Sequence, residues 1–226
     1  MTPEQVTERA PLEAPRAIDI GLSAPGIYNK GSARMFKSDF FERLSHVHPA
    51  TPAIVFGPVV LFLTVLALRV PGAKLGVVAL QLVGGYLAWT VTEYWLHRLL
   101  FHLPVVGPKT KAVYFYVHGV HHDWPWDMSR LVIPPGASLV LFVAFYGLFR
   151  ALFGATGLYA PYAGFVAGYV LYDSVHCWVH ARAPKSAFGK WLRREHMVHH
   201  FKEPNTRFGV SCPWMDYVFG TTGNRK

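Results

Sequence analysis

Two apolar stretches set the architecture of this chain: residues 53–70 read AIVFGPVVLFLTVLALRV, and residues 75–92 read LGVVALQLVGGYLAWTVT. Each is close to the roughly 20 residues with which a helix crosses a hydrocarbon core of about 30 Å. Two further stretches of this kind cover residues 133–153 and 158–175. Because the links within each pair are short, the pattern predicts an all-α integral membrane protein with four transmembrane helices in two antiparallel hairpins.

The composition supports this prediction. Hydrophobic residues make up 52% of the 226 residues and charged residues only 15%, and the mean hydropathy is +0.23. Soluble domains carry about 25% charged residues, so four buried helices of a soluble protein are the weaker interpretation. The same figures exclude a disordered chain, and two cysteines are too few for a disulfide scaffold.

The positive charges predict the orientation in the membrane. An even number of crossings places both termini and residues 93–132 on one side, and only Arg69, Lys74 and Arg150 of the 22 Lys and Arg residues lie on the other. Because Lys and Arg mark the cytoplasmic side, the more basic side should be cytoplasmic. The orientation in the membrane accounts for the net charge of +9, and the sequence contains no motif that recognises nucleic acid bases. We therefore expect no nucleic acid partner.

The first 34 residues are mostly polar and have no apolar core near Met1, which predicts a flexible tail and no cleaved signal peptide. The membrane domain is expected to cover residues 35–226. It begins with the basic and aromatic run MFKSDFF at residues 35–41, which favours a helix lying on the membrane surface.

Ten of the twelve histidines fall into four clusters at or beyond the predicted cytoplasmic ends of the helices. Residues three and four apart share a helix face, so HxxHH at 118–122 and 196–200 and HxxxH at 176–180 can each direct two or three imidazoles to one point. The spacing of five between the remaining two requires a distortion or a helix end. The ten are His97, His102, His118, His121, His122, His176, His180, His196, His199 and His200.

Imidazole binds zinc, copper, iron and nickel, and ten imidazoles exceed the needs of one ion. The count therefore predicts two metal ions, each with four or five histidine ligands, in a cytosolic helical cap. No catalytic residue beyond these ligands is predicted. His46 and His48 lie beside Pro49 outside any cluster, and we expect them to be hydrogen-bonded structural residues.

The order HxxxxH, HxxHH, HxxxH, HxxHH resembles the fatty acid hydroxylase and sterol desaturase superfamily of membrane di-iron enzymes. RLVIPP at 130–135, HFK at 200–202, FGV at 208–210 and FGT at 219–221 resemble its fatty acid 2-hydroxylase branch. The similarity covers residues 35 to the C-terminus. It implies O2-dependent hydroxylation at the 2-position of a fatty acid or lipid-linked acyl chain by two iron ions, which zinc can replace in a purified sample.

The resemblance has one departure. Members with a cytochrome b5 domain carry His-Pro-Gly-Gly, which this sequence does not contain. It is therefore more similar to the bacterial members, which implies a separate electron donor (cytochrome b5, ferredoxin or similar) and the bacterial inner membrane, with the endoplasmic reticulum as the alternative location.

Other functions stay open at this point. Within the superfamily, a sterol or carotenoid hydroxylase or desaturase is the alternative. A metal-dependent membrane hydrolase would need neither O2 nor reductant. A metal transporter would place polar ligands at mid-membrane depth, whereas these histidines lie at the ends of the apolar stretches.

Residues close to the histidines in sequence are further candidates. We expect one or two of four carboxylates to hydrogen-bond ligand histidines, with helix capping or an interfacial charge as the alternative: Glu93, Asp173, Asp123 and Glu195. Four residues after the second cluster are candidates for substrate contacts, and the last two for pairing or for meeting a lipid head group: Trp124, Trp126, Asp127 and Arg130.

The cysteines and some glycines have structural interpretations. Cys177 and Cys212 should be free thiols on a reducing face. Four glycines are predicted to pack helices closely: Gly84, Gly85, Gly164 and Gly168.

Overall fold

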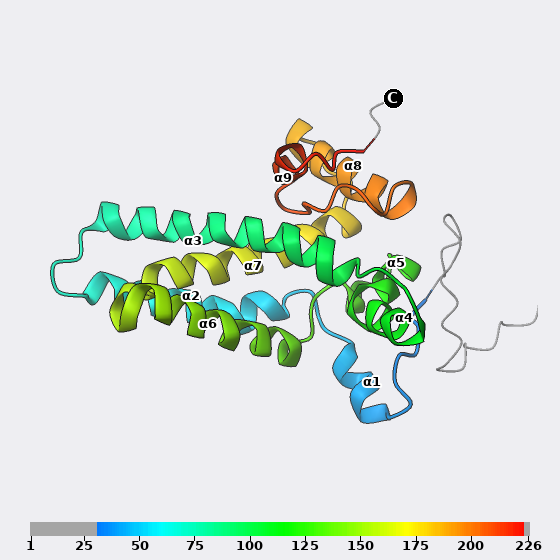
Figure 1. Ribbon diagram of the computed structural model, residues 1–226, viewed down its shortest axis with the longest axis horizontal. Helices are drawn as coiled ribbons and strands as arrows, with labels where there is room; N and C mark the ends of the chain where they lie inside the picture. The colour runs from blue at the N-terminus through cyan, green and yellow to red at the C-terminus, as the bar shows by residue number, and fades with distance from the viewer. Residues whose placement is uncertain (1–30, 224–226) are drawn as a thin grey trace, which may run out of the picture.

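The structure is a computed structural model that describes residues 31–223. Within these residues every regular element is helical and no strand is present. Four long helices lie side by side, and shorter helices gather at one end of them, which we call the cap (Figure 1). The predicted flexible tail lies outside the described residues except for residues 31–34.

The four predicted apolar stretches correspond to the four long helices. These are α2 (Thr51–Arg69), α3 (Leu75–Trp95), α6 (Pro135–Gly157) and α7 (Tyr159–Ala181). The cap contains α1 (Asp39–Ser45), α4 (Pro108–Tyr114), α5 (Val120–Asp123), α8 (Ala187–Phe201) and α9 (Trp214–Val218). Two π turns, η1 (Leu96–Phe101) and η2 (Phe115–Gly119), and a 3-10 turn, η3 (Met128–Arg130), complete the described elements.

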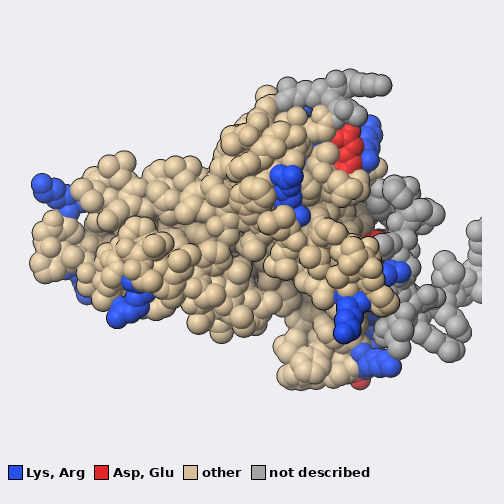
Figure 2. Space-filling model, viewed as in Figure 1, with Lys and Arg blue, Asp and Glu red and all other residues tan. Residues whose placement is uncertain are grey.

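Three segments of the described chain are long and apolar enough to cross a membrane: Thr51–Arg69, Leu75–Phe101 and Met128–Gly157. Their outer side chains are exposed apolar groups, such as Leu80 and Val140. In the face drawn in Figure 2, the middle of the long helices carries no charged side chain, and Lys and Arg appear at the far end and around the cap. This distribution is that of a membrane protein.

The stretch predicted as the fourth crossing, residues 158–175, is not among these three segments. The helix that contains it, α7, contacts α2, α3 and α6 and buries most of its side chains. Few side chains of a helix surrounded by other helices contact lipid. Its surface therefore carries small and aromatic residues that pack against the neighbouring helices in place of lipid-facing leucines. The composition of this helix therefore reflects burial inside the bundle more than contact with lipid.

Glycines allow α7 to approach α3 closely. A Cβ atom on Gly85 would lie 1.8 Å from the carbonyl oxygen of Pro161, and one on Gly164 would lie 2.0 Å from that of Leu82. A Cβ on Gly168 would meet the side chain of Trp89. Gly84 faces open space, so the prediction that it packs against another helix is wrong. Gly85, which points about 100° away from it around the helix, lies in the interface instead.

We expect Gly85→Ala to destabilise the protein and Gly84→Ala to leave it unchanged or stabilise it slightly. The added methyl group at Gly85 must push two backbones apart, and overpacking of this kind costs about 1–3 kcal/mol. At Gly84 the methyl group enters open space, and alanine favours a helix interior over glycine by about 1 kcal/mol. Thermal unfolding of both variants in detergent checks the difference, and equal midpoints would contradict the close contact.

The N-terminal described segment folds back onto the cap. Ala33 is buried, so the packed domain begins slightly before the predicted boundary at residue 35. The expected membrane-surface helix corresponds to α1, which leaves Phe40, Phe41 and Leu44 more than half exposed. Three neighbouring apolar side chains on one short helix are suited to an interfacial position, where they can enter the head-group layer.

Candidate metal centre

The π turn η1 brings the first two clustered histidines together. The amide N–H of His102 donates to the carbonyl oxygen of His97 at 3.0 Å, a bond that spans five residues. This wider turn is the distortion that the spacing of five residues requires, and it places both rings on one side of the chain. Single π turns inside helices occur frequently at functional sites.

The continuous helical segment of η2 and α5, and the helix α8, each distribute their HxxHH cluster between two sites. In each cluster the residues four apart (His118 and His122, or His196 and His200) face one site, and the residue between them faces the other. Adjacent residues on a helix point about 100° apart, so a helix that passes between two sites can serve both. The spacing alone left open which histidines belong together.

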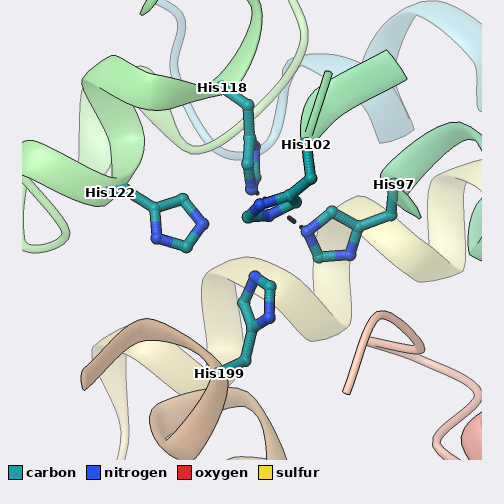
Figure 3. Close-up of side chains that lie close together, drawn as sticks. All are labelled: His97, His102, His118, His122 and His199. Atoms are coloured by element: carbon teal, nitrogen blue, oxygen red, sulfur yellow. Dashed lines mark hydrogen bonds between the residues drawn. The ribbon is translucent and has the colours of Figure 1, made fainter. Parts of the chain in front are cut away.

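Five histidines from four elements form the first group (Figure 3). One nitrogen from each lies within 4.8 Å of the others, and the Nε2 atoms of His97 and His118 are 3.1 Å apart. Four of these residues are buried and one is half-buried. The group consists of His97, His102, His118, His122 and His199.

The other five clustered histidines form the second group, and all are buried. The Nε2 atom of His196 lies 2.8 Å from that of His180 and 3.1 Å from that of His200, while those of His121 and His176 are 2.9 Å apart. The two groups adjoin, because the ring of His122 stacks on that of His200 with centroids 4.2 Å apart. All ten predicted ligand residues therefore lie in two adjacent clusters.

The electrostatics of both groups suit metal binding. Burial, assisted by the neighbouring rings, holds the pKa of His118, His121, His122, His196 and His200 well below the usual value, and burial lowers the pKa of His199 to about 4. The rings are therefore neutral near pH 7, with a lone pair available. In the first group, the buried Nε2 atoms of His102, His122 and His199 have no hydrogen-bond partner among the described residues. Converging imidazole nitrogens without partners fit a bound cation such as iron or zinc.

The loop between α8 and α9, residues 202–213, orients two rings of the first group. The Nδ1 atom of His97 donates to the carbonyl oxygen of Phe208 at 2.6 Å, and that of His199 donates to the carbonyl oxygen of Thr206 at 2.7 Å. A carbonyl oxygen only accepts, so each Nδ1 carries the proton and each Nε2 keeps its lone pair. This loop selects the tautomer that a metal ligand needs.

Two carboxylates hold this loop in place. Glu93 on α3 accepts hydrogen bonds from the backbone N–H of Ser211 at 2.8 Å and from the Ser211 hydroxyl. Asp216 on α9 accepts from the N–H groups of Phe208 and Gly209 at 2.8 and 2.9 Å. In the structure Glu93 thus bonds a serine where a histidine was expected, and it acts on His97 through the loop that contains Ser211 and Phe208.

We expect Glu93→Ala to weaken metal binding without removing a ligand. The substitution leaves a buried N–H group of Ser211 without its acceptor, which costs about 1–3 kcal/mol, and it releases the loop that orients His97. Loss of such an outer contact typically lowers metal affinity about 10–100-fold. Competition with a chelator measures this affinity. Thr92→Ala is the matched control, because Thr92 is a half-buried neighbour on α3 whose hydroxyl bonds the carbonyl oxygen of Ala88. Equal affinities of the two variants would contradict the role of the loop.

The other three candidate carboxylates have different surroundings. Glu195 accepts from the guanidinium of Arg207 at 2.9 Å and from Arg194. Asp173 is fully buried on α7 beside the hydroxyl of Tyr169. Asp123 is buried at the end of α5, where burial together with the charge of Asp123 raises the pKa of Tyr114 to about 12. Glu195 therefore pairs with arginines and not with a ligand histidine.

A cavity of about 560 Å³ reaches both histidine groups. Its inner end is bounded by His118 of the first group and by His121 and His176 of the second. Its walls are mostly apolar and come from η1, η2, the start of α6 with the residues before it, α7 and the N-terminal segment. Where Val140 and Ala144 line it, the cavity adjoins the exposed apolar surface of α6. An apolar molecule can therefore reach the histidines from the side of the bundle.

Of the four residues predicted to contact substrate, Arg130 is the one that lines this cavity. Its side chain is buried and pairs with Glu42 at 2.6 Å and with Asp127 at 3.4 Å, and it donates to the carbonyl oxygen of Ala33 at 2.5 Å. The expected pairing with Asp127 is therefore present, and a second carboxylate joins it. Arg130 holds the N-terminal segment against the cap.

The two tryptophans predicted to contact substrate have other neighbours. Trp124 packs beside Met35 and Val120, and Trp126 is half exposed, stacked on Phe201 with ring centroids 5.8 Å apart. Neither lines the cavity.

The histidines and cysteines outside the two groups are structural. His46 bonds Ser129 and Glu42, and the Nδ1 atom of His48 accepts from a backbone N–H, as expected for structural histidines. Cys177 and Cys212 are buried free thiols, as predicted.

Sequence analysis missed the residues of the α8–α9 loop that act on the histidines. Phe208 was recognisable only as part of a motif shared with a family, and nothing in the sequence indicated that its carbonyl oxygen would bond His97. Nothing indicated that Asp216 would hold the loop. Tyr116, which stacks on Phe36 and lines the cavity, was not among the residues predicted to contact substrate. Only contacts between distant segments reveal these roles.

Comparison with known proteins agrees with this site. The family model described as fatty acid hydroxylase matches residues 82–221. A dihydroceramide fatty acyl 2-hydroxylase of Arabidopsis thaliana is 37% identical over 191 residues, which cover 83% of this chain and 79% of the relative. A ceramide very long chain fatty acid hydroxylase of Saccharomyces cerevisiae is 37% identical over 203 residues, which cover 88% of this chain and 52% of the relative.

A solved structure shows the same fold. The structure of full-length Scs7p, in which only the hydroxylase domain is visible, superposes with a TM-score of 0.79 at 35% identity, and the match covers 85% of this chain and 72% of that chain. The resemblance inferred from the histidine clusters is thereby confirmed. The matched residues 82–221 contain all ten grouped histidines, the cavity-lining part of α6 and the orienting loop, and the chain belongs to the fatty acid hydroxylase family.

Proposed function

We propose that this protein is an O2-dependent membrane hydroxylase that acts on the 2-position of a fatty acid or of a lipid-linked acyl chain. The observation that carries the proposal is the apolar cavity, whose inner end meets histidines of both groups and whose other side adjoins the lipid-facing surface of α6. The relatives named as fatty acyl 2-hydroxylases support the choice of substrate and of position.

Each histidine group would hold one iron ion. Bound iron would supply the reduction of O2 and the removal of a hydrogen atom from the C–H bond. The chain supplies five neutral imidazoles for each ion, with the tautomers of His97 and His199 set by the α8–α9 loop. Zinc binds the same ligands, so the metal found in a purified sample need not be the working metal.

The cavity walls would position the substrate. Apolar side chains such as Leu100 and Leu141 exclude water along the acyl chain, while the hydroxyl groups of Ser45 and Tyr116 line the wall on the side of the N-terminal segment. We place the carboxyl or amide end of the substrate toward these hydroxyl groups. The adjacent carbon, C2, would then lie against the histidines, and the chain would extend along α6 toward the bilayer.

For the topology we propose four crossings in two hairpins, with the cap on the cytoplasmic face. The fourth helix, α7, has 23 residues, about 35 Å of helix, and runs in contact with the three apolar helices. The positive charges on the cap side support the orientation. For the location we propose the bacterial inner membrane, with the endoplasmic reticulum as the alternative. Because the sequence contains no His-Pro-Gly-Gly motif, we propose that a separate protein donates the electrons.

Lipid profiling of a host that expresses the chain tests the proposal. We expect new acyl species that carry a hydroxyl group at C2, formed only when O2 is present. A hydroxyl group or double bond on a sterol or carotenoid would instead support another activity of the superfamily. Hydrolysis that continues without O2 and reductant would refute the hydroxylase assignment.

A further inference from the structure

A second hollow of the protein lies on the outer side of α8, away from the acyl cavity. It has a volume of about 450 Å³, and none of its lining residues lines that cavity. Its lining includes no acidic residue, and Arg194 pairs with Glu195 outside the lining. Four cationic side chains line it: Lys190, Arg193, Arg194 and Lys202. Pro184, Met197, Val198 and Phe201 form an apolar floor. We call this feature the basic groove.

The basic groove is close to the second histidine group. The same helix carries His196 and His200 on its inner face and Lys190 and Arg194 on its outer face, and Lys202 directly follows its last residue. The ring of Phe201 on the groove floor lies 5.9 Å from that of His200, measured between centroids. Through Trp126, the floor also connects to His180, with successive centroid distances of 5.8 and 6.0 Å. A molecule seated in the groove is thus one aromatic side chain away from the candidate metal ligands.

The proposed function requires electrons at this position. Conversion of C–H to C–OH with O2 consumes two electrons and two protons and releases one water molecule (C–H + O2 + 2 e⁻ + 2 H⁺ → C–OH + H2O). A one-electron carrier must therefore bind, be oxidised and leave twice for each product. Such a carrier needs a surface that is separate from the substrate cavity, accessible from water and close to the histidines, and the basic groove has these three properties.

We propose that the basic groove is the docking site of a small acidic protein that carries one electron at a time. This inference rests on the proposed function. Four cations around an apolar floor match a partner whose cofactor edge is apolar and surrounded by carboxylates, and charge complementarity of this kind speeds association and sets orientation. The charges on the rim attract the partner, and the floor lets its cofactor approach Phe201.

Binding to the full chain in phosphatidylcholine nanodiscs tests the docking site. The probes are a soluble acidic [2Fe–2S] ferredoxin, the acidic haem domain of cytochrome b5, and basic cytochrome c as the probe of opposite charge. We expect at least one acidic carrier to bind at low ionic strength and cytochrome c not to bind. The double variant Lys190→Glu with Lys202→Glu should raise the dissociation constant on the order of tenfold, and added salt should weaken binding of the unaltered protein.

The control carries the same charge change on the cap outside the groove, as Lys37→Glu with Lys109→Glu, and should leave the dissociation constant unchanged. Equal weakening by both double variants would show a general charge effect and overturn the assignment of the groove. Failure of both acidic carriers to bind would also overturn it. Binding that is lost when phosphatidylserine is added to the nanodiscs, without any effect of the groove variant in its absence, would assign the cations to lipid head groups instead.

These measurements need no turnover, so they separate the two proposals. Groove-dependent binding without any 2-hydroxy product would preserve the docking site and refute the reaction. Product formation with a groove variant that binds its carrier normally would preserve the reaction and refute the docking site.

Discussion

Replacement of His121 by alanine is expected to abolish the 2-hydroxy product and to lower the metal content of the protein. The Nε2 atom of His121 lies 2.9 Å from that of His176, and its ring is 4.5 Å from the ring of His200. The same ring lines the inner end of the acyl cavity. The substitution therefore removes one of five nitrogens from the second group and opens that group to the cavity.

The first group keeps all five of its histidines in this variant, so we expect a loss of at most one metal ion per chain. Metal analysis of the purified protein and mass spectrometry of host lipids measure the two effects. His48→Ala is the matched control, because His48 lies outside both groups and its ring accepts a hydrogen bond only from the local backbone. Undiminished product together with undiminished metal in His121→Ala would refute the role of the second group.

The second large effect is expected from filling the acyl cavity. Ala137 lies in the first turns of α6 and lines the cavity, so an indole ring at this position would occupy the path of the acyl chain. We expect Ala137→Trp to reduce product formation about a hundredfold, the size of loss that displacement of a substrate by about 1 Å can cause. The histidine groups are not altered, so the metal content should remain unchanged.

Ala151→Trp makes the same chemical change on the exposed surface of α6, outside the cavity, and should leave product formation unaltered. Lipid profiling and metal analysis of both variants check the prediction. If Ala137→Trp forms as much product as Ala151→Trp, the acyl chain does not follow this cavity. If it loses metal as well as product, the substitution has disturbed the site and not the substrate path.

The two predictions examine different parts of one arrangement. His121 belongs to the histidines that would hold a metal, whereas Ala137 contributes only space. A loss of metal in the first variant and its retention in the second would separate ligand binding from substrate access. The Glu93→Ala variant should have an intermediate effect on metal binding, because it keeps every histidine and changes only the loop that orients the ring of His97.

The amino-acid sequence alone determined the helical class, the positions of the long helices and the identity of the ten clustered histidines. These features depend on local periodicity: an apolar run of about 20 residues forms a spanning helix in any bundle, and residues three or four apart share a face. A distortion or a helix end between His97 and His102 was also foreseeable, because five residues do not fit one face of a straight α-helix, and the structure shows a π turn there.

Only the tertiary structure decided how these parts act together. It divided each HxxHH cluster between two groups, gave Glu93 a serine 118 positions away as its partner, and enclosed Arg130 between Glu42 and Asp127. It also placed α7 inside the bundle, where its glycines and tyrosines pack against the neighbouring helices. Such contacts join segments far apart in the chain, and their geometry depends on how whole helices pack, which no local spacing encodes.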